Sequence, residues 1–392
     1  MNSEQSKVVG DRKRCALVGA YPQSVASFRG DLIAAIVRQG LAVTAMSAEA
    51  DSSTRQLIEA TGAQFRAYPI SRNSMNPRSD WETYRSLKEC FRELRPDLIL
   101  AYTIKPVIWG GFAARTTPNA RFFALITGLG YAFQGTGLKR KLLKSITTHL
   151  YRSSLWHAKG VVFQNPDNRD LFVRRQIVPM NKCHVVNGSG INVSTFIPSS
   201  FPSGPTRFLL IARLLREKGL REYFQASLLV KQRFPDVTFS LLGPCDPSPD
   251  GVPMPEVQSW HEQGVVEYLG QTTDVRPYIE NSHVYVLPSY HEGIPRTVLE
   301  AMAMGRPILT TDASGCKETV VDGLNGWMVP KADASKLAER MIWFIENRDR
   351  WNEMGIESRR IAQEKFDVKS VNAEMLRIME IGPNLHPLSV RT

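Results

Sequence analysis

The sequence has no long apolar run. None of its 392 residues lies in a stretch that approaches the ~18 consecutive apolar residues of a membrane-spanning helix. The amino-terminal segment MNSEQSKVVGDRKRC also lacks the apolar core of an export signal. We therefore expect no transmembrane helix and a cytoplasmic location.

Cysteine is scarce and scattered. The cysteines are odd in number and none stand in CxxC spacing, which favours reduced thiols over a disulfide framework or a zinc site. They are Cys15, Cys90, Cys183, Cys245 and Cys316.

Motifs for nucleic-acid binding are missing, although the net charge is +11. There is no zinc finger, no RNP-type run and no basic region joined to heptads. The positive charge belongs to the first half: residues 1–195 carry 27 Lys and Arg against 13 Asp and Glu, or +14, and the remainder carries −3. We expect no nucleic-acid partner. An anionic membrane surface or a phosphorylated acceptor suits the basic half better.

What the sequence does contain is a repeated alternation of apolar strands and amphipathic helices, interrupted by one stretch rich in Gly, Ser and Pro at 187–205. Repeated βα units predict parallel sheets covered by helices on both faces, and the chain is too long for one ordinary core. Strands are predicted at 15–20, 42–46, 65–68, 97–101, 160–163, 183–186, 207–211, 237–242, 265–268, 284–287 and 307–311, and helices at 28–38, 53–61, 81–95 and 220–233.

One stretch organises the second half: YVLPSYHEGIPRTVLEAMAMGRP, at 285–307. A strand leads into a polar turn, and Pro295 opens a helix. The unpaired N–H groups and positive dipole end of that helix would stabilise an anion held over 293–297. Glu292 lies in the turn, whereas Glu300 falls on a face that should be buried. A buried carboxylate needs donors, and a ribose diol would supply two. Two acidic residues eight positions apart also occur on many solvent-exposed helices. It is therefore the strand–loop–helix context that favours a binding site at Glu292 and Glu300.

This stretch resembles the signature of glycosyltransferase family 4, whose members are retaining enzymes of the GT-B fold. The resemblance implies that Glu292 lies by the donor sugar and that Glu300 grips the nucleotide ribose. ARLLREKGL resembles the family's RLxxxKG, so Arg213 and Lys218 are expected to bind the donor's phosphates and, with Glu292, to carry catalysis. The remaining donor-binding residues expected are Gly293, Ile294, Pro295, Arg296, Thr297, Gly19, Gly270 and Gln271.

The resemblance also implies the architecture. We expect an α/β protein of two Rossmann-like, doubly wound parallel-sheet domains that face a central cleft. The predicted bounds are 1–190 for the acceptor- and membrane-facing domain, 191–206 for a linker, 207–367 for the nucleotide-sugar domain, and 368–392 for a helix that crosses back to the first domain.

Metal-binding motifs are not apparent. The acidic run DPSPD, at 246–250, is broken by prolines, and no Asp-x-Asp ends a strand. The leaving UDP would then be neutralised by Arg213, Lys218 and the helix N-terminus. We expect no cofactor and no metal requirement.

Three stretches of the first half, GAYPQSVASFRG, DLILAYTIKPVIWG and FALITGLGYAFQ, follow or end predicted strands. They resemble a narrower group within the family, transferases that add an N-acetylhexosamine to a sugar on a polyprenyl diphosphate. The acceptor residues implied are Arg29, Lys105, Thr127 and Gly128. Many family members carry a His where this sequence has Thr127 and Gly128, so no imidazole can act from there.

The segment LKRKLLKSITTHLYRSSLW, at 138–156, reads as a basic amphipathic helix. Leu142, Leu143, Ile146 and Leu150 are expected on one stripe, with Lys139, Arg140, Lys141 and Lys144 close to it. Such a helix lies in a membrane interface, or it packs against a core and leaves a solvated basic face. The charge asymmetry and the acceptor class favour peripheral binding to the inner face of the plasma membrane.

These features together predict a retaining glycosyltransferase that moves a sugar, expected to be an N-acetylhexosamine, from a UDP-sugar to a polyprenyl-diphosphate-linked sugar in bacterial glycan assembly. The alternatives are a UDP-sugar 2-epimerase of the same two-lobed fold, a transferase with a soluble acceptor, and a non-catalytic scaffold at the membrane.

Overall fold

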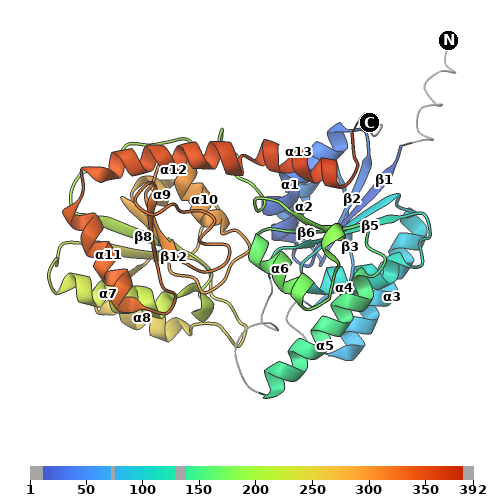
Figure 1. The fold of residues 1–392 in the computed structure, drawn as a ribbon, viewed down its shortest axis with the longest axis horizontal. Coiled ribbons are helices and arrows are strands. Elements are labelled where there is room, and N and C mark those ends of the chain that lie inside the picture. Colours follow the sequence, from blue (N-terminus) through green and yellow to red (C-terminus); the bar gives the residue numbers. More distant parts are fainter. Residues whose placement is uncertain (1–11, 72–75, 129–137, 383–392) are drawn as a thin grey trace, which may run out of the picture. The chain divides into compact units, whose positions relative to one another are not determined.

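The computed structural model describes residues 12–71, 76–128 and 138–382, and in it the chain forms two compact units (Figure 1). One unit comprises residues 1–189 together with 372–392, and the other comprises 190–371. Each unit is built on its own parallel β-sheet, so each has its own core.

The first unit contains a seven-stranded sheet in the order β3-β2-β1-β4-β5-β6-β7, with all described pairs parallel. The order reverses between β1 and β4, and ligands of such sheets gather at the carboxyl ends of the strands beside that point. The strands are β1 (Arg14–Val18), β2 (Ala42–Ser47), β3 (Gln64–Ala67), β4 (Leu98–Tyr102), β5 (Arg121–Ile126), β6 (Gly160–Phe163) and β7 (Cys183–Val185). The helices are α1 (Pro22–Arg38), α2 (Ser52–Glu59), α3 (Pro77–Leu94), α4 (Ile104–Ala114), α5 (Leu138–Leu155) and α6 (Pro166–Arg174).

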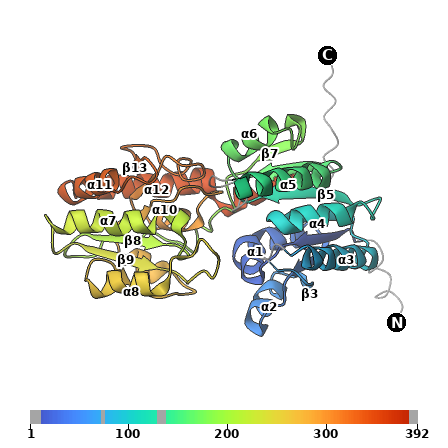
Figure 2. The same cartoon turned by 90° about the horizontal axis from the view of Figure 1, so that it is seen from below.

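The second unit contains a six-stranded sheet in the order β10-β9-β8-β11-β12-β13, again parallel throughout its described pairs, with the reversal between β8 and β11. Its strands are β8 (Arg207–Ile211), β9 (Thr238–Leu242), β10 (Glu267–Tyr268), β11 (Val284–Leu287), β12 (Ile308–Thr311) and β13 (Gly326–Val329). Its helices are α7 (Leu220–Lys231), α8 (Met254–Glu262), α9 (Arg276–Glu280), α10 (Arg296–Ala303), α11 (Ala334–Glu346) and α12 (Arg350–Phe366). Figure 2 shows α7, α8, α10, α11 and α12 from below.

Alternate residues of the central strands contribute to two cores, one on each face of the sheet. In β8, Phe208 and Leu210 pack with residues of α7 and α11, whereas Leu209 and Ile211 pack with residues of α10 and α12. Side chains of a strand point alternately to opposite faces, so a strand covered on both sides must be apolar throughout. That is why these strands read as continuous apolar runs in the sequence.

The segment 191–206, predicted as a linker, packs into the second unit. Arg306 is fully buried and donates to the carbonyls of Ser199 and Ser200, and Arg359 donates to those of Val193 and Phe196. Composition alone suggests a flexible connection, but Arg306 and Arg359, far along the chain, donate hydrogen bonds to backbone carbonyls of this segment. At the other boundary, α13 (Val368–Ile378) begins in the second unit and belongs to the first from residue 372 onward.

The segment after β1 differs from the prediction. Residues 19–30 were expected to begin with a loop that leads to a helix at 28, but α1 begins at Pro22 and the loop is three residues long. Proline presets the helical φ and needs no N–H partner in the first turn, so the helix begins there. Ser24, Ser27 and Arg29 therefore project from a helix.

Candidate functional site

The carboxyl ends of β8 and β11 bring together two of the predicted residues. Lys218 follows β8 at the end of a short 3-10 turn, Arg216–Lys218, and Glu292 lies in the loop between β11 and α10. Lys218 Nζ lies 2.5 Å from Glu292 Oε1, and each side chain is 14% exposed. A charged pair this sheltered from water is a strong contact, and it sits at the point where the strand order reverses.

Backbone contacts hold the two loops against each other. Gly219 has φ +71°, and a Cβ there would lie 2.1 Å from the carbonyl oxygen of Pro288, so the position requires glycine. The backbone N–H of Tyr290 donates to the carbonyl of Glu217 at 2.8 Å, and Ser289 Oγ donates to the same oxygen at 3.1 Å. These bonds fix Lys218 beside Glu292 without help from a ligand.

Glu300 is buried, as predicted, and lies on α10, which confirms the strand–loop–helix prediction for this stretch. The sequence predicts a ribose diol as a source of these donors, and the structure adds one from the protein itself, because Arg296 Nε donates to Glu300 Oε1 at 3.1 Å. The two are four residues apart on one helix, a spacing that places side chains side by side. Burial raises the pKa of Glu300, and the Arg296 guanidinium opposes that rise only in part.

Arg213 also has an acidic partner, one that sequence reasoning missed. Its Nη1 donates to Oδ2 of Asp246, the first residue of the DPSPD run. Burial alone would raise the pKa of Asp246, but hydrogen bonds from Ser248 and the charge of Arg213 hold it below its usual value. The sequence indicates that DPSPD follows a strand, but not that its first carboxylate faces the loop after β8.

The turn after β10 contains Gly270 and Gln271. Gly270 has φ +75°, and its carbonyl accepts from the N–H of Gly243 at 2.7 Å, which joins this turn to the end of β9. Gln271 is exposed. Gly293, Ile294 and Pro295 are buried in the loop that enters α10, and Thr297 is half-buried in its first turn. The predicted residues of the second unit thus line the carboxyl edge of one sheet.

In the first unit, Gly19 and Arg29 both lie against Tyr102. A Cβ at Gly19 would meet the Tyr102 hydroxyl at 2.4 Å, and the Arg29 guanidinium stacks over the Tyr102 ring at 5.1 Å. Arg29 is only 5% exposed, so its charge faces the protein rather than open solvent. Burial raises the pKa of Tyr102 to about 12, with Ser24 Oγ 2.9 Å from its hydroxyl oxygen.

Lys105, at the start of α4, pairs with Asp80 at 2.7 Å, and both side chains are mostly buried. Thr103, just before α4, has φ 67° and ψ 163°, a conformation that is essentially confined to glycine and marks backbone strain. Its hydroxyl has no hydrogen-bond partner among the described residues. Thr127 and Gly128 follow β5 and are half-buried, and residues 129–137 beyond them lie outside the described part of the chain.

Helix α5 presents a mixed outer face. Leu142 and Ile146 are 63% and 48% exposed, whereas Leu143 and Leu150 are half-buried, so the predicted apolar stripe is exposed along one side and partly covered along the other. Lys141 is exposed. The pKa of Lys144 is lowered, mainly by burial and to a smaller extent by the positive charge of Arg175. The side chains of Lys139 and Arg140 lie outside the described part. No helix among the described residues is long and apolar enough to span a bilayer.

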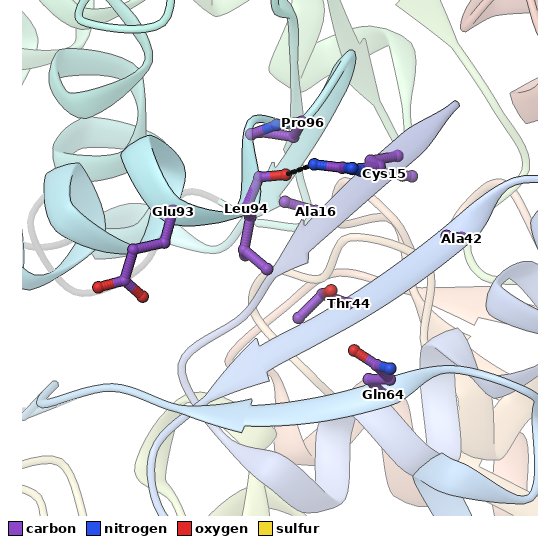
Figure 3. Close-up of a pocket in the computed structure, with 9 residues that line it drawn as sticks. Cys15, Ala16, Ala42, Thr44, Gln64, Glu93, Leu94 and Pro96 are labelled. Atoms are coloured by element: carbon purple, nitrogen blue, oxygen red, sulfur yellow. Dashed lines mark hydrogen bonds between the residues drawn. The ribbon is translucent and has the colours of Figure 1, made fainter. Parts of the chain in front are cut away.

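A hollow of about 210 Å³ lies at the opposite edge of the first sheet, where β1, β2 and β3 begin (Figure 3). Arg14, Ala42 and Gln64 open these strands there, and the Arg14 guanidinium donates to the carbonyl of Leu94 at 3.1 Å. None of the predicted site residues lines it. Ligands of doubly wound sheets bind at the carboxyl ends instead, which favours the edges described above.

Two family models match the chain. Residues 25–188 match the glycosyl transferase 4-like domain, and residues 205–347 match glycosyl transferases group 1. Among curated proteins, the chain is 29% identical over 310 residues to N,N'-diacetylbacillosaminyl-diphospho-undecaprenol alpha-1,3-N-acetylgalactosaminyltransferase of Campylobacter jejuni, covering 76% of this chain and 80% of the relative. It is 24% identical over 323 residues to the putative glycosyltransferase EpsD of Bacillus subtilis, covering 77% and 81%.

Solved structures share the fold. Sucrose-phosphate synthase from Thermosynechococcus elongatus superposes with a TM-score of 0.77 at 18% identity, over 94% of this chain and 98% of that one. Anabaena Alr3699/HepE, solved in complex with UDP-glucose, superposes with a TM-score of 0.76 at 18% identity, over 94% and 100%. At this identity the likeness concerns the fold alone.

Proposed function

The chain belongs to the glycosyltransferases, as a group 1 member with a 4-like domain and the GT-B fold, and from this premise we propose a specific reaction for it. It moves an N-acetylhexosamine, with retention of configuration, from a UDP-sugar to a sugar carried on a polyprenyl diphosphate. The setting is the assembly of a bacterial polysaccharide or other glycan, in keeping with the names of its curated relatives.

The observation that carries the proposal is the Lys218–Glu292 contact at the point where the second sheet reverses its order. Arg213 stands just past the end of β8, and the first turn of α10 opens after Pro295. Two cations and a helix N-terminus offer the donors that a diphosphate needs. Glu292 lies beside them, where a carboxylate accepts from hydroxyls of the sugar attached to that diphosphate.

In the proposed reaction the glycosidic carbon–oxygen bond to UDP breaks as the acceptor hydroxyl attacks from the same face. The departing diphosphate oxygen takes the proton of that hydroxyl, so UDP leaves carrying it and no other base is required. Arg213 and Lys218 stabilise the charge that develops on the diphosphate, and Glu292 positions the sugar. We propose that this requires no metal ion.

Glu300 is the proposed ribose contact. It is 8% exposed and hydrogen-bonded to Arg296, so the carboxylate is held in one orientation before any nucleotide arrives. A ribose diol would donate to the carboxylate oxygen that Arg296 leaves available. Gly270 and Gln271 follow β10, at the edge of the same sheet, and are the proposed binding site for the nucleobase.

The acceptor is proposed to bind the first unit, through Arg29, Lys105, Thr127 and Gly128. The support comes from their position at the carboxyl edge of β4 and β5 and beside Tyr102, and from the Campylobacter jejuni relative, whose name gives a diphospho-undecaprenol acceptor. Exposed Leu142 and Ile146, together with Lys141, support binding of α5 to an anionic membrane.

The deciding experiment measures UDP release and lipid product with a panel of UDP-sugars and an undecaprenyl-diphosphate-linked amino sugar, with and without EDTA. We expect turnover of one UDP-N-acetylhexosamine, unaffected by EDTA and lost in Glu292→Ala. Interconversion of a UDP-sugar without acceptor would instead assign an epimerase. UDP release with a free sugar acceptor would assign a soluble acceptor, and no chemistry with any substrate would assign a scaffold.

A further inference from the structure

The loop after β9 runs alongside the phosphate-binding segment that follows β8. The N–H of Leu214 donates to the carbonyl of Pro244 at 2.9 Å, and the N–H of Val252 donates to the carbonyl of Leu214 at 2.8 Å. Further along, the N–H of Arg216 donates to the carbonyl of Asp250, also at 2.9 Å. The loop is therefore a built part of this site, although its sequence shows no recognisable motif.

Asp246 stands at the start of this loop, with its side chain 8% exposed. One carboxylate oxygen accepts from the N–H of Ser248 at 3.0 Å, and the other accepts from Nη1 of Arg213. The Arg213 side chain is 40% exposed, so it remains accessible to solvent while it is paired with Asp246. The sheltered carboxylate of Asp246 thus binds one end of the Arg213 guanidinium, and the Arg213 side chain remains accessible.

We propose that Asp246 is a positioning residue that fixes the orientation of Arg213 for the leaving diphosphate. This deepens the proposed function and rests on it. A guanidinium presents five donors in a planar fork, so anchoring one corner sets the direction of the rest. The negative charge of Asp246 opposes an incoming diphosphate, so its contribution is geometric. Asp246 should therefore affect stabilisation of the charge that develops on the diphosphate in the transition state, and not the affinity of the resting enzyme for UDP.

Asp246→Asn tests this, with Asp250→Asn as the matched control. Both changes remove one negative charge from the same loop. Within the described part of the chain, however, the one hydrogen bond to the Asp250 side chain comes from the N–H of Glu217, at 3.3 Å, and asparagine can still accept it. For Asp246→Asn we expect kcat to fall on the order of 10²-fold, as for a misplaced catalytic group. We also expect UDP, measured by calorimetry, to bind at least as tightly as to the wild type.

A double-mutant cycle with Arg213→Ala locates the effect, because Asp246→Asn should cost nothing more once Arg213 is absent. The proposal is overturned if both asparagine variants lose activity equally, if Asp246→Asn weakens UDP binding or the melting temperature in step with kcat, or if its loss persists without Arg213. Full activity of Asp246→Asn overturns it as well. Wild-type turnover in the same assay tests the proposed function separately, and a wild type that transfers no sugar overturns both.

Discussion

The ammonium of Lys218 and the carboxylate of Glu292 form a contact of 2.5 Å between residues 74 apart in sequence. It exists because β8 and β11 are neighbours in the sheet although β9 and β10 lie between them in the chain. In the proposed function Lys218 binds the diphosphate and Glu292 the sugar, so substitutions of the two side chains should have different effects.

The first prediction separates their roles. Lys218→Gln removes a cation from the proposed diphosphate seat, so UDP affinity should fall, whereas Glu292→Gln should abolish transfer without weakening UDP binding. Each change removes one partner of a sheltered ionic contact, so each should cost about 1–3 kcal/mol in the free energy of unfolding. Calorimetric titration with UDP and urea denaturation measure the two effects. Equal loss of UDP affinity in both variants would contradict the assigned roles.

The second prediction concerns the packing of segment 191–206. Arg306 is fully buried, its guanidinium donates to the backbone of both Ser199 and Ile279, and burial lowers its pKa to about 10. Arg306→Met should therefore destabilise the second unit by about 3 kcal/mol, since several buried carbonyls lose their donor. The control is Arg233→Met, which removes an exposed pair with Glu346 and should cost at most about 1 kcal/mol. Urea denaturation of both variants provides the comparison, and equal costs would refute the anchoring role.

The third prediction follows from the raised pKa of Glu300. Burial raises this pKa above its value of 4.5 in an unfolded chain, so protonation of Glu300 is easier in the folded protein than in the unfolded chain. The associated stability is fully present below the unfolded pKa and is lost as the pH rises through the folded pKa. Glu300→Gln mimics the protonated form at every pH. Its melting temperature should match the wild type at about pH 4 and exceed it at pH 7. A difference that does not change with pH would show that Arg296 fully compensates the burial.

The fourth prediction tests the outer face of α5. The double change Leu142→Ser and Ile146→Ser should reduce binding to vesicles of phosphatidylglycerol and phosphatidylcholine by roughly 10-fold or more, because two apolar side chains no longer enter the interface. Binding by the wild type should also weaken as salt screens Lys141. Leu229→Ser on α7, where Leu229 is 43% exposed, is the matched control in the other unit and should bind like the wild type. Co-sedimentation measures all three proteins, and unchanged binding of the double variant would remove α5 from the membrane surface.

Much of the second sheet could be read from local pattern. The strand at 284–287 matches β11 to the residue, and the helix opened by Pro295 is α10. Boundaries shifted where a local signal was undervalued: Pro22 and Pro77 each begin a helix several residues before the predicted start. Proline at the first helical position is itself a sequence signal, so the sequence contains the information that places both starts.

The partners of the charged residues could not be read in the same way. Nothing near Arg213 in sequence indicates Asp246, and helical periodicity alone did not decide which of Leu142 and Leu143 faces outward. The partner of Arg213 and the exposure of Leu142 and Leu143 both depend on residues that other helices, strands and loops bring close in space. Arg296 and Glu300 are an intermediate case, because their spacing of four on a helix is visible in the sequence, whereas only the structure shows the hydrogen bond between them.

The sequence by itself determined the alternation of strands and helices, the two α/β sheets and the strand–loop–helix stretch that carries Glu292 and Glu300, because these follow from apolar periodicity and from proline and glycine at turns. Only the tertiary structure decided that Arg213 meets Asp246, that Lys218 meets Glu292, and that residues 191–206 pack into the second unit. The physical reason is the strand order β9-β8-β11, which sets side by side three loops that the chain keeps far apart. This strand order therefore determines which charged side chains pair with one another.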